Sequence, residues 1–196
     1  MHYFRYIFRL RLNGLNVERV TNPSKGSRHS EISFSEDGTK MLYAEFQPNR
    51  KTSLIMKDIK SGDEITIMSS KRSGDEFYKP FVHPTGDEVV FLRNMAKDST
   101  YIFDIFSLDV KSGKIENLTN TPNISERMPN WSDDGRYLVY SSNAQGFSFD
   151  LYKCLRGDDS SIQISFVNSR QELNGRYLKI DRFLQLCVRL KYIGSL

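Results

Sequence analysis

Asn130–Ser142 reads NWSDDGRYLVYSS, and two earlier stretches of the chain repeat its pattern. Ser33–Glu45 reads SFSEDGTKMLYAE, and Phe81–Arg93 reads FVHPTGDEVVFLR. In each stretch a short apolar segment leads into a tight turn, and a second apolar segment follows it. The turns end at glycines spaced by 48 and 49 positions, which are Gly38, Gly86 and Gly135. A repeat of this period indicates a tandem array of one structural unit.

Each unit carries four short apolar segments separated by turn residues. The first two flank the turn glycine, which adopts positive φ without steric cost and is typical of β-hairpins. The third segments are expected at 53–58, 104–109 and 150–155, and the fourth at 64–68, 114–119 and 161–166. Because no helical periodicity interrupts this pattern, we interpret each unit as a four-stranded propeller blade whose apolar faces pack on neighbouring blades.

The two ends of the chain complete this organisation. Residues 6–10 and 17–21 match the third and fourth strands of a unit, and the alternation of Tyr6, Phe8, Leu10 and Leu12 predicts one packed and one solvated face. At the other end, residues 174–178 (NGRYL) echo residues 134–138 (DGRYL). We expect a half blade at 3–22, blades at about 30–70, 78–120 and 128–167, and a degenerate blade or basic C-terminal tail at 168–196.

The third unit resembles a known repeat. Trp131 opens the run WSDDGRYLVY, and Asp150-Leu151-Tyr152 follows; together they are similar to the WD40-like repeat of TolB-type propellers, roughly W-S-P-D-G-x-x-I-A-F and then D-I-Y. The resemblance covers about residues 6–166. Departures from it are Glu36 and Asp133 in place of Pro, and the run at 83–85 (HPT) in place of Ser-Pro-Asp.

The family has six blades, so the resemblance implies an all-β, TolB-like β-propeller that is partial, with about three and a half to four four-stranded antiparallel blades. TolB works in the bacterial envelope with a peptidoglycan-associated lipoprotein. The resemblance therefore implies protein binding, with a periplasmic or cell-envelope location common in the family.

Charge is distributed unevenly along the chain, whose formal net charge is +4. Residues 168–196 contribute +4, and Arg5, Arg9 and Arg11 add +3, so subtracting both from +4 leaves −3 for the remainder. A nucleic-acid-binding protein would show one dense basic face with interleaved aromatic residues. We expect a mixed-sign surface and no nucleic-acid partner.

The sequence contains few signals of export, membrane insertion or redox chemistry. Arginines interrupt the N-terminal run MHYFRYIFRLRLNG, so it lacks the apolar core of a secretory signal, and the compartment stays open. No run approaches the roughly 18 apolar residues of a membrane helix, so no membrane span is expected. Cys154 and Cys187 match no metal or redox spacing, and whether they pair is open.

The sequence gives only weak signals of a catalytic or metal site. The run 146–150 (GFSFD) misses the G-x-S-x-G nucleophile motif by its last residue, and Ser148 is expected in a loop before a third strand. A metal site would need several ligands to converge, whereas the histidines are scattered: His2, His29 and His83. His83 is expected to occupy the turn position that Ser35 and Ser132 fill in the other units. Asp104 and Asp150 recur at one blade position, which favours a structural role such as bonding backbone amides. We expect no catalytic residue, metal or cofactor.

The best candidate surface is formed by the segments that lead into the first strands. We expect these segments to be loops on one rim of the propeller, and their charged and aromatic residues suit protein recognition: Arg28, His29, Glu31, Glu76, Tyr78, Lys79, Glu126 and Arg127.

Two functions follow from these patterns. The first is a non-catalytic, TolB-like scaffold for protein–protein interaction. The alternative is a propeller domain of an enzyme, either a gate for a prolyl-oligopeptidase-like peptidase or a metal-dependent sugar lyase. An open arc of blades leaves unpaired strand edges, and such edges would allow two copies of the chain to form a homodimer.

Overall fold

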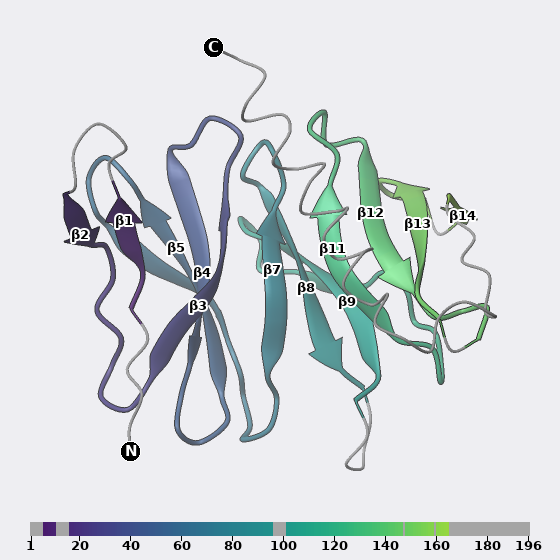
Figure 1. Cartoon of the computed structure of the whole chain (residues 1–196), viewed down its shortest axis with the longest axis horizontal. Helices are drawn as coiled ribbons and strands as arrows, with labels where there is room; N and C mark the ends of the chain where they lie inside the picture. The colour runs from purple at the N-terminus through teal and green to yellow at the C-terminus, as the bar shows by residue number, and fades with distance from the viewer. Residues whose placement is uncertain (1–5, 11–15, 96–100, 147, 159, 165–196) are drawn as a thin grey trace.

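The computed structural model describes residues 6–10, 16–95, 101–146, 148–158 and 160–164, and in these residues the chain is all-β (Figure 1). Three four-stranded antiparallel sheets and one two-stranded sheet stand side by side, from β1 and β2 at one side to β14 at the other (Figure 1). Each large sheet is ordered as it runs in sequence, from its first to its fourth strand. The prediction of partial propeller blades is confirmed.

The first large sheet contains β3 (Arg28–Phe34), β4 (Lys40–Phe46), β5 (Thr52–Asp58) and β6 (Glu64–Ser69). The second contains β7 (Phe77–Val82), β8 (Glu88–Asn94), β9 (Phe103–Asp109) and β10 (Ile115–Asn117). The third contains β11 (Glu126–Trp131), β12 (Tyr137–Ser142), β13 (Asp150–Leu155) and β14 (Ser161–Gln163). The repeated turns join the first and second strand of each sheet, as their glycines predicted.

The core lies between the sheets. One apolar cluster joins the first and second sheets, with Leu42 and Leu54 packed beside Phe77 and Val82. The next joins the second and third sheets, where Trp131 packs with Val90, Leu92 and Ile105. Residues of β7 and β11 thus fill the interface with the sheet before them, which explains why a single blade cannot bury its apolar face alone.

The N-terminal pair, β1 (Phe8–Leu10) and β2 (Val17–Arg19), is antiparallel and stands beside the first sheet. The predicted packed face is wrong, because Phe8 is 56% and Leu10 57% exposed. Ile7 is buried instead, and it packs with Met41, Tyr43 and Ile55. Leu12 and residues 168–196 lie outside the described residues.

Candidate functional site

The residues suggested for partner binding lie in or beside the first strands. Arg28, His29 and Glu31 lie on β3, Tyr78 and Lys79 on β7, and Glu126 and Arg127 on β11, whereas Glu76 precedes β7. Their placement in loops was therefore wrong for all except Glu76. The reason is that the second strands run far enough to pair with them, as Arg28 with Phe46 and Glu126 with Ser142 show.

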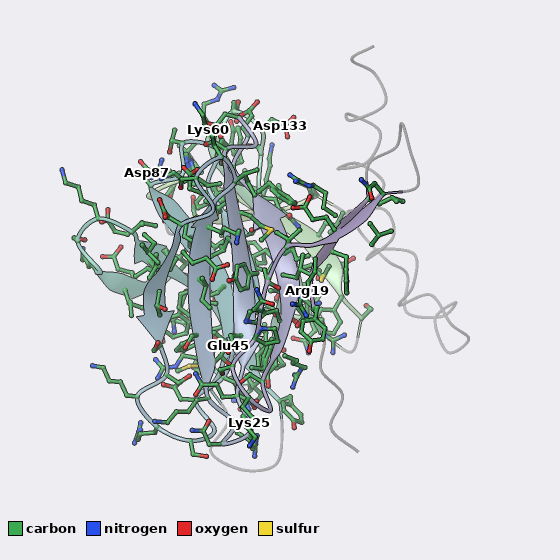
Figure 2. All side chains as sticks on the ribbon, turned by 90° about the vertical axis from the view of Figure 1, so that its left-hand side faces the viewer. Arg19, Lys25, Glu45, Lys60, Asp87 and Asp133 are labelled. Carbon is green, nitrogen blue, oxygen red and sulfur yellow. The ribbon has the colours of Figure 1, made fainter. Side chains whose placement is uncertain are left out.

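These residues gather at one end of the molecule. Figure 2 shows Lys60, Asp87 and Asp133 at one end, and Lys25, which precedes β3, at the opposite end. We call the end where β3, β7 and β11 begin the first-strand rim, and the end that holds the repeated glycine turns the turn rim. The candidate site occupies the first-strand rim.

Two of the suggested residues are buried in the structure. His29 and Glu126 are buried, and both lie nine positions before the turn glycine of their unit, as Phe77 does in the second unit. All three positions point into the interior, which the sequence did not reveal because two of the residues are polar. His29 and Glu126 are therefore internal groups.

Glu126 is held by hydroxyl groups. Its carboxyl oxygens accept hydrogen bonds from Thr121 Oγ1 at 2.9 Å, Thr119 Oγ1 at 3.2 Å and Ser142 Oγ at 3.3 Å. Burial is the main cause that raises the pKa of Glu126 to about 7; the nearby charge of Asp104 acts in the same direction, and the three hydrogen bonds act against it. The carboxyl group is thus partly protonated near neutral pH.

His29 lies in an equally enclosed position on β3. Its Nε2 is 3.7 Å from Glu45 Oε1, and its ring centroid is 4.7 Å from that of Tyr43. Burial lowers the pKa of His29, against the carboxylate of Glu45, which raises it. The imidazole is therefore mainly neutral at pH 7, and its Nδ1 has no hydrogen-bond partner among the described residues.

Every first strand contains a β-bulge at the same position. Pairing with the second strand shifts register there, and the bulged residues Glu31, Lys79 and Met128 have φ of 60°, 50° and 51°. A positive φ is uncommon for residues other than glycine. In the second and third units proline follows the bulged residue, a sequence signal of a bulge in a strand.

The bulges connect neighbouring sheets. The backbone N–H of Lys79 donates to Glu31 Oε2 at 2.6 Å, and Lys79 Nζ lies 3.5 Å from Glu31 Oε1. Further along the same two strands, Val82 N–H donates to Ser33 Oγ at 3.3 Å. Side chains of β3 therefore accept hydrogen bonds from backbone groups of β7, which ties these two first strands together.

An aromatic row crosses the rim from the first sheet to the second. Arg28 stacks over the ring of Phe46 at 4.3 Å, and the Phe46 ring centroid lies 5.6 Å from that of Tyr78. Tyr78 contacts Phe103 at 5.5 Å, and Phe103 stacks on Tyr101 at 6.0 Å. We call these five residues the aromatic row. Sequence analysis missed Phe46, Phe103 and Tyr101, because they come from a second strand, a third strand and the segment before it, which meet the first strands only in the folded protein.

Charged groups surround the aromatic row. Tyr78 Oη donates to Glu76 Oε2 at 2.9 Å, and Glu76 also lies 3.3 Å from Arg50 Nη2. Burial raises the pKa of Tyr78 above its usual range, so the phenol keeps its proton. In the third sheet Arg127 stacks over Phe149 at 4.1 Å. Arg28, Arg50 and Arg127 are exposed, which makes the outer surface of this rim rich in arginine.

The turn rim holds a different set of contacts. His83 occupies the turn position of Ser35 and Ser132, as predicted, since all three accept the N–H of the turn glycine through their carbonyl oxygens. His83 Nδ1 lies 2.7 Å from Thr85 Oγ1, and its ring packs edge-on against Trp131 at 5.0 Å. His83 thus joins the second and third sheets.

No metal site emerges from the described residues. They bring no three His, Cys, Asp or Glu side chains together in the way a metal ion requires. His29 lies near the start of β3, and His83 follows the end of β7, so the two histidines belong to opposite rims. The part of the chain that the structure describes contains no helix suited to crossing a membrane.

The remaining candidates have structural positions. Ser148 precedes β13, in the connection where the sequence placed it. Asp104 accepts a hydrogen bond from Asn117 Nδ2 at 2.6 Å, whereas the sequence suggested backbone amides. Asn117 Oδ1 in turn accepts the N–H groups of Thr119 and Asn120, so Asp104 stabilises the turn after β10 through Asn117.

Comparison with known proteins identifies similar folds among solved structures. No protein-family model matches the chain, and no curated protein sequence matches it. TolB from Acinetobacter baumannii superposes with a TM-score of 0.65 at 20% identity, over 83% of this chain and 38% of TolB. An oligogalacturonate lyase from Vibrio parahaemolyticus superposes with a TM-score of 0.66 at 16% identity, over 84% of this chain and 48% of the lyase.

A puromycin-hydrolyzing peptidase from Mycobacterium tuberculosis is similar as well, with a TM-score of 0.60 at 14% identity, over 83% of this chain and 28% of the peptidase. The chain spans less than half the length of each of these three proteins. At these identities the likeness shows the fold. The described residues form an arc of a TolB-like β-propeller.

Proposed function

We propose that this chain is a non-catalytic propeller scaffold that binds a protein partner at the first-strand rim. The observation that carries the proposal is the aromatic row, which places arginine, tyrosine and phenylalanine side chains together, four of its five residues on strands and Tyr101 just before β9. Tyrosine and arginine dominate the energetics of protein interfaces, because they combine a large contact area with polar groups. Strands that are bonded to one another hold these groups ready for binding at a low entropic cost.

The charges of the rim indicate the kind of partner surface. Arg28 and Arg127 are exposed, and Lys79 is 48% exposed at its side chain although it is close to Glu31. A partner with carboxylates around an apolar patch would complement these cations and the aromatic row. Such complementarity mainly raises the association rate and the selectivity.

The test reverses charge on the rim. Affinity capture from extract, with mass spectrometry, identifies a partner, and the purified partner is then titrated against the wild type and a Lys79→Glu/Arg127→Glu variant. We expect at least a tenfold weaker Kd for the variant. A matched control reverses two exposed cations of the turn rim, Lys60→Glu and Arg136→Glu, and should bind as the wild type does. Equal affinity of the first-strand variant and the wild type would remove this rim from consideration.

The alternative function is that of an enzyme's propeller domain. It is favoured by the similarity to the lyase and to the peptidase, although that similarity shows the fold alone. Metal analysis of the purified chain distinguishes the lyase branch, since a stoichiometric ion retained after desalting would support it. The peptidase branch predicts a hydrolase domain encoded in the same or the adjacent reading frame.

A further inference from the structure

The first sheet has an uncovered flank that the other two sheets lack. Counting back from the turn glycines, Phe34 corresponds to Val82 and Trp131. Val82 is 1% and Trp131 7% exposed, whereas Phe34 is 48% exposed. The position two residues earlier behaves in the same way, since Pro80 and Pro129 are buried and Ile32 is 45% exposed.

The packing of the other sheets explains the difference. Val82 packs on the sheet before it, against Leu42 and Leu54, and β7 contacts the first three strands of that sheet. On the corresponding side of β3 stand β1 and β2, which match the third and fourth strands of a blade. The described residues therefore contain no counterpart to the first and second strands that would cover Ile32 and Phe34.

The space left by these two strands is a groove of about 660 Å³ between β1 and β3. It is lined by Tyr6, Ile7, Phe8 and residues 29–32. His29 belongs to this lining, and its buried Nδ1 has no hydrogen-bond partner among the described residues.

One edge of β1 is open to the groove. Ile7 directs both backbone groups to the β2 side, since its N–H donates to Thr21 Oγ1 and its carbonyl oxygen accepts from Val20 N–H. Backbone groups alternate in direction along a strand, so the N–H of Phe8 points to the opposite edge. Among the described residues no strand pairs with that edge.

The chain itself carries a segment of the required type. After the fourth strand of a unit, the repeat continues with a first strand, a glycine turn and a second strand. Residues 165–196 follow β14 in the sequence, and they include Asn174-Gly175 with the same Arg-Tyr-Leu run that follows Gly135. Figure 1 shows β14 and the pair β1–β2 at opposite sides of the arc, so the segment begins far from the groove of its own copy.

We infer that residues 165–196 of a second copy of this chain dock in the groove between β1 and β3, where they add two strands to the edge of β1 and cover Ile32 and Phe34. This inference can be tested separately from the partner-binding proposal, because the groove lies between β1 and β3, whereas the aromatic row runs from β3 towards the second sheet, and the two take different occupants. The exchange is heterologous, since the groove of one copy receives the C-terminal segment of another.

The experiment measures the mass of the full chain by light scattering after size-exclusion chromatography, over a range of concentrations. We expect assembly of two or more 22.8 kDa chains. Phe8→Pro removes the open N–H and leaves the β1–β2 hydrogen bonds in place, so it should return the chain to a monomer. The control is Val17→Pro, which removes an N–H on the outer edge of β2 and should assemble as the wild type does.

A second pair of variants identifies the occupant. Gly175→Pro should also give a monomer, because it disrupts the turn of the donated segment. Mixing the Phe8→Pro chain, which has an intact segment, with the Gly175→Pro chain, which has an intact groove, should form a one-to-one complex. If the Gly175→Pro chain still assembles, the occupant is another surface of the copy, and the inference is wrong.

Hydrogen exchange keeps the inference testable if a proline variant fails to fold. In the wild type, the amides of Phe8 and Leu10 should become at least tenfold better protected as concentration rises, while those of Val17 and Arg19 do not change. A monomer at every concentration, or protection that does not depend on concentration, would overturn the inference.

Discussion

His83 Nε2 lies 3.0 Å from the carbonyl oxygen of Gly135, so a side chain from the second sheet closes directly on the turn of the third. Arg156 Nη1 lies 3.1 Å from the same nitrogen, and Trp131 packs against the ring. The contact uses the one unit in which histidine replaces the serine of the turn. It makes the turn glycine of the third unit part of an interface between sheets.

Gly135→Ala should therefore destabilise the fold more than the equivalent change in the first unit. A Cβ on Gly135 would lie 2.4 Å from His83 Nε2, whereas a Cβ on Gly38 would meet nothing within 4 Å. Both glycines have positive φ, 68° and 66°, which costs alanine about 1–2 kcal/mol. Overpacking adds about 1–3 kcal/mol at Gly135 alone. Urea unfolding of both variants measures the difference.

His83→Ser provides the control for this comparison, since serine is the residue of the other two units. In a His83→Ser background, Gly135→Ala should cost no more than Gly38→Ala does. If the two alanine variants lose equal stability in the wild-type background, His83 is not held against the turn.

Stability should fall as pH rises through neutrality, and Glu126 should be the cause. Because the folded pKa of Glu126 is raised to about 7 from 4.5, the folded state binds more protons than the unfolded state between these values. The contribution of Glu126 is fully present below pH 4.5 and is lost as pH rises through 7, with a limiting slope of about 1.4 kcal/mol per pH unit.

Glu126→Gln removes this contribution because the amide does not titrate. Denaturant unfolding at pH 5, 6, 7 and 8 measures the free energy of unfolding of both proteins. We expect the stability of the variant relative to the wild type to rise as pH rises. His29 acts in the opposite direction, since its lowered pKa makes stability rise with pH, but it is present in both proteins and cancels in the difference. Parallel pH profiles would contradict the raised pKa.

The bulge at Met128 should reverse the usual ranking of residues in a strand. With φ at 51°, Met128→Gly should be neutral or stabilising by up to about 1 kcal/mol, and Met128→Val should be destabilising by about 1–2 kcal/mol. At the neighbouring Arg127, whose φ is not positive, Arg127→Gly should be more destabilising than Arg127→Val. Thermal and urea unfolding of the four variants compare the two positions.

Tyr101 should matter for binding and little for folding. Its side chain is exposed and stacks on Phe103, so Tyr101→Ala should change the free energy of unfolding by less than about 0.5 kcal/mol. Affinity for the identified partner should fall about tenfold or more, which corresponds to about 1.4 kcal/mol. Ile65→Ala on β6, another exposed apolar residue, should leave calorimetric binding unchanged.

The sequence alone determined the repeat and with it the blades. The spacing of Gly38, Gly86 and Gly135 predicted three hairpins, and the runs that follow them predicted the third and fourth strands within a few residues. These features could be predicted because hairpin turns and alternating strands depend on local backbone chemistry, which acts over a few neighbouring residues.

Tertiary structure decided which side chains meet. Glu126 and His29 are polar and were expected on the surface, yet both are buried, Glu126 among the hydroxyl groups of Thr119, Thr121 and Ser142 and His29 beside Tyr43. Phe8 was expected on a packed face, but it is exposed. Phe34 is exposed as well, on the flank where the described residues contain no counterpart to a first and a second strand. The aromatic row joins residues from four strands of two sheets and from the segment that precedes one of them. Contacts of this kind arise from packing between units that are distant in sequence, so no local pattern records them.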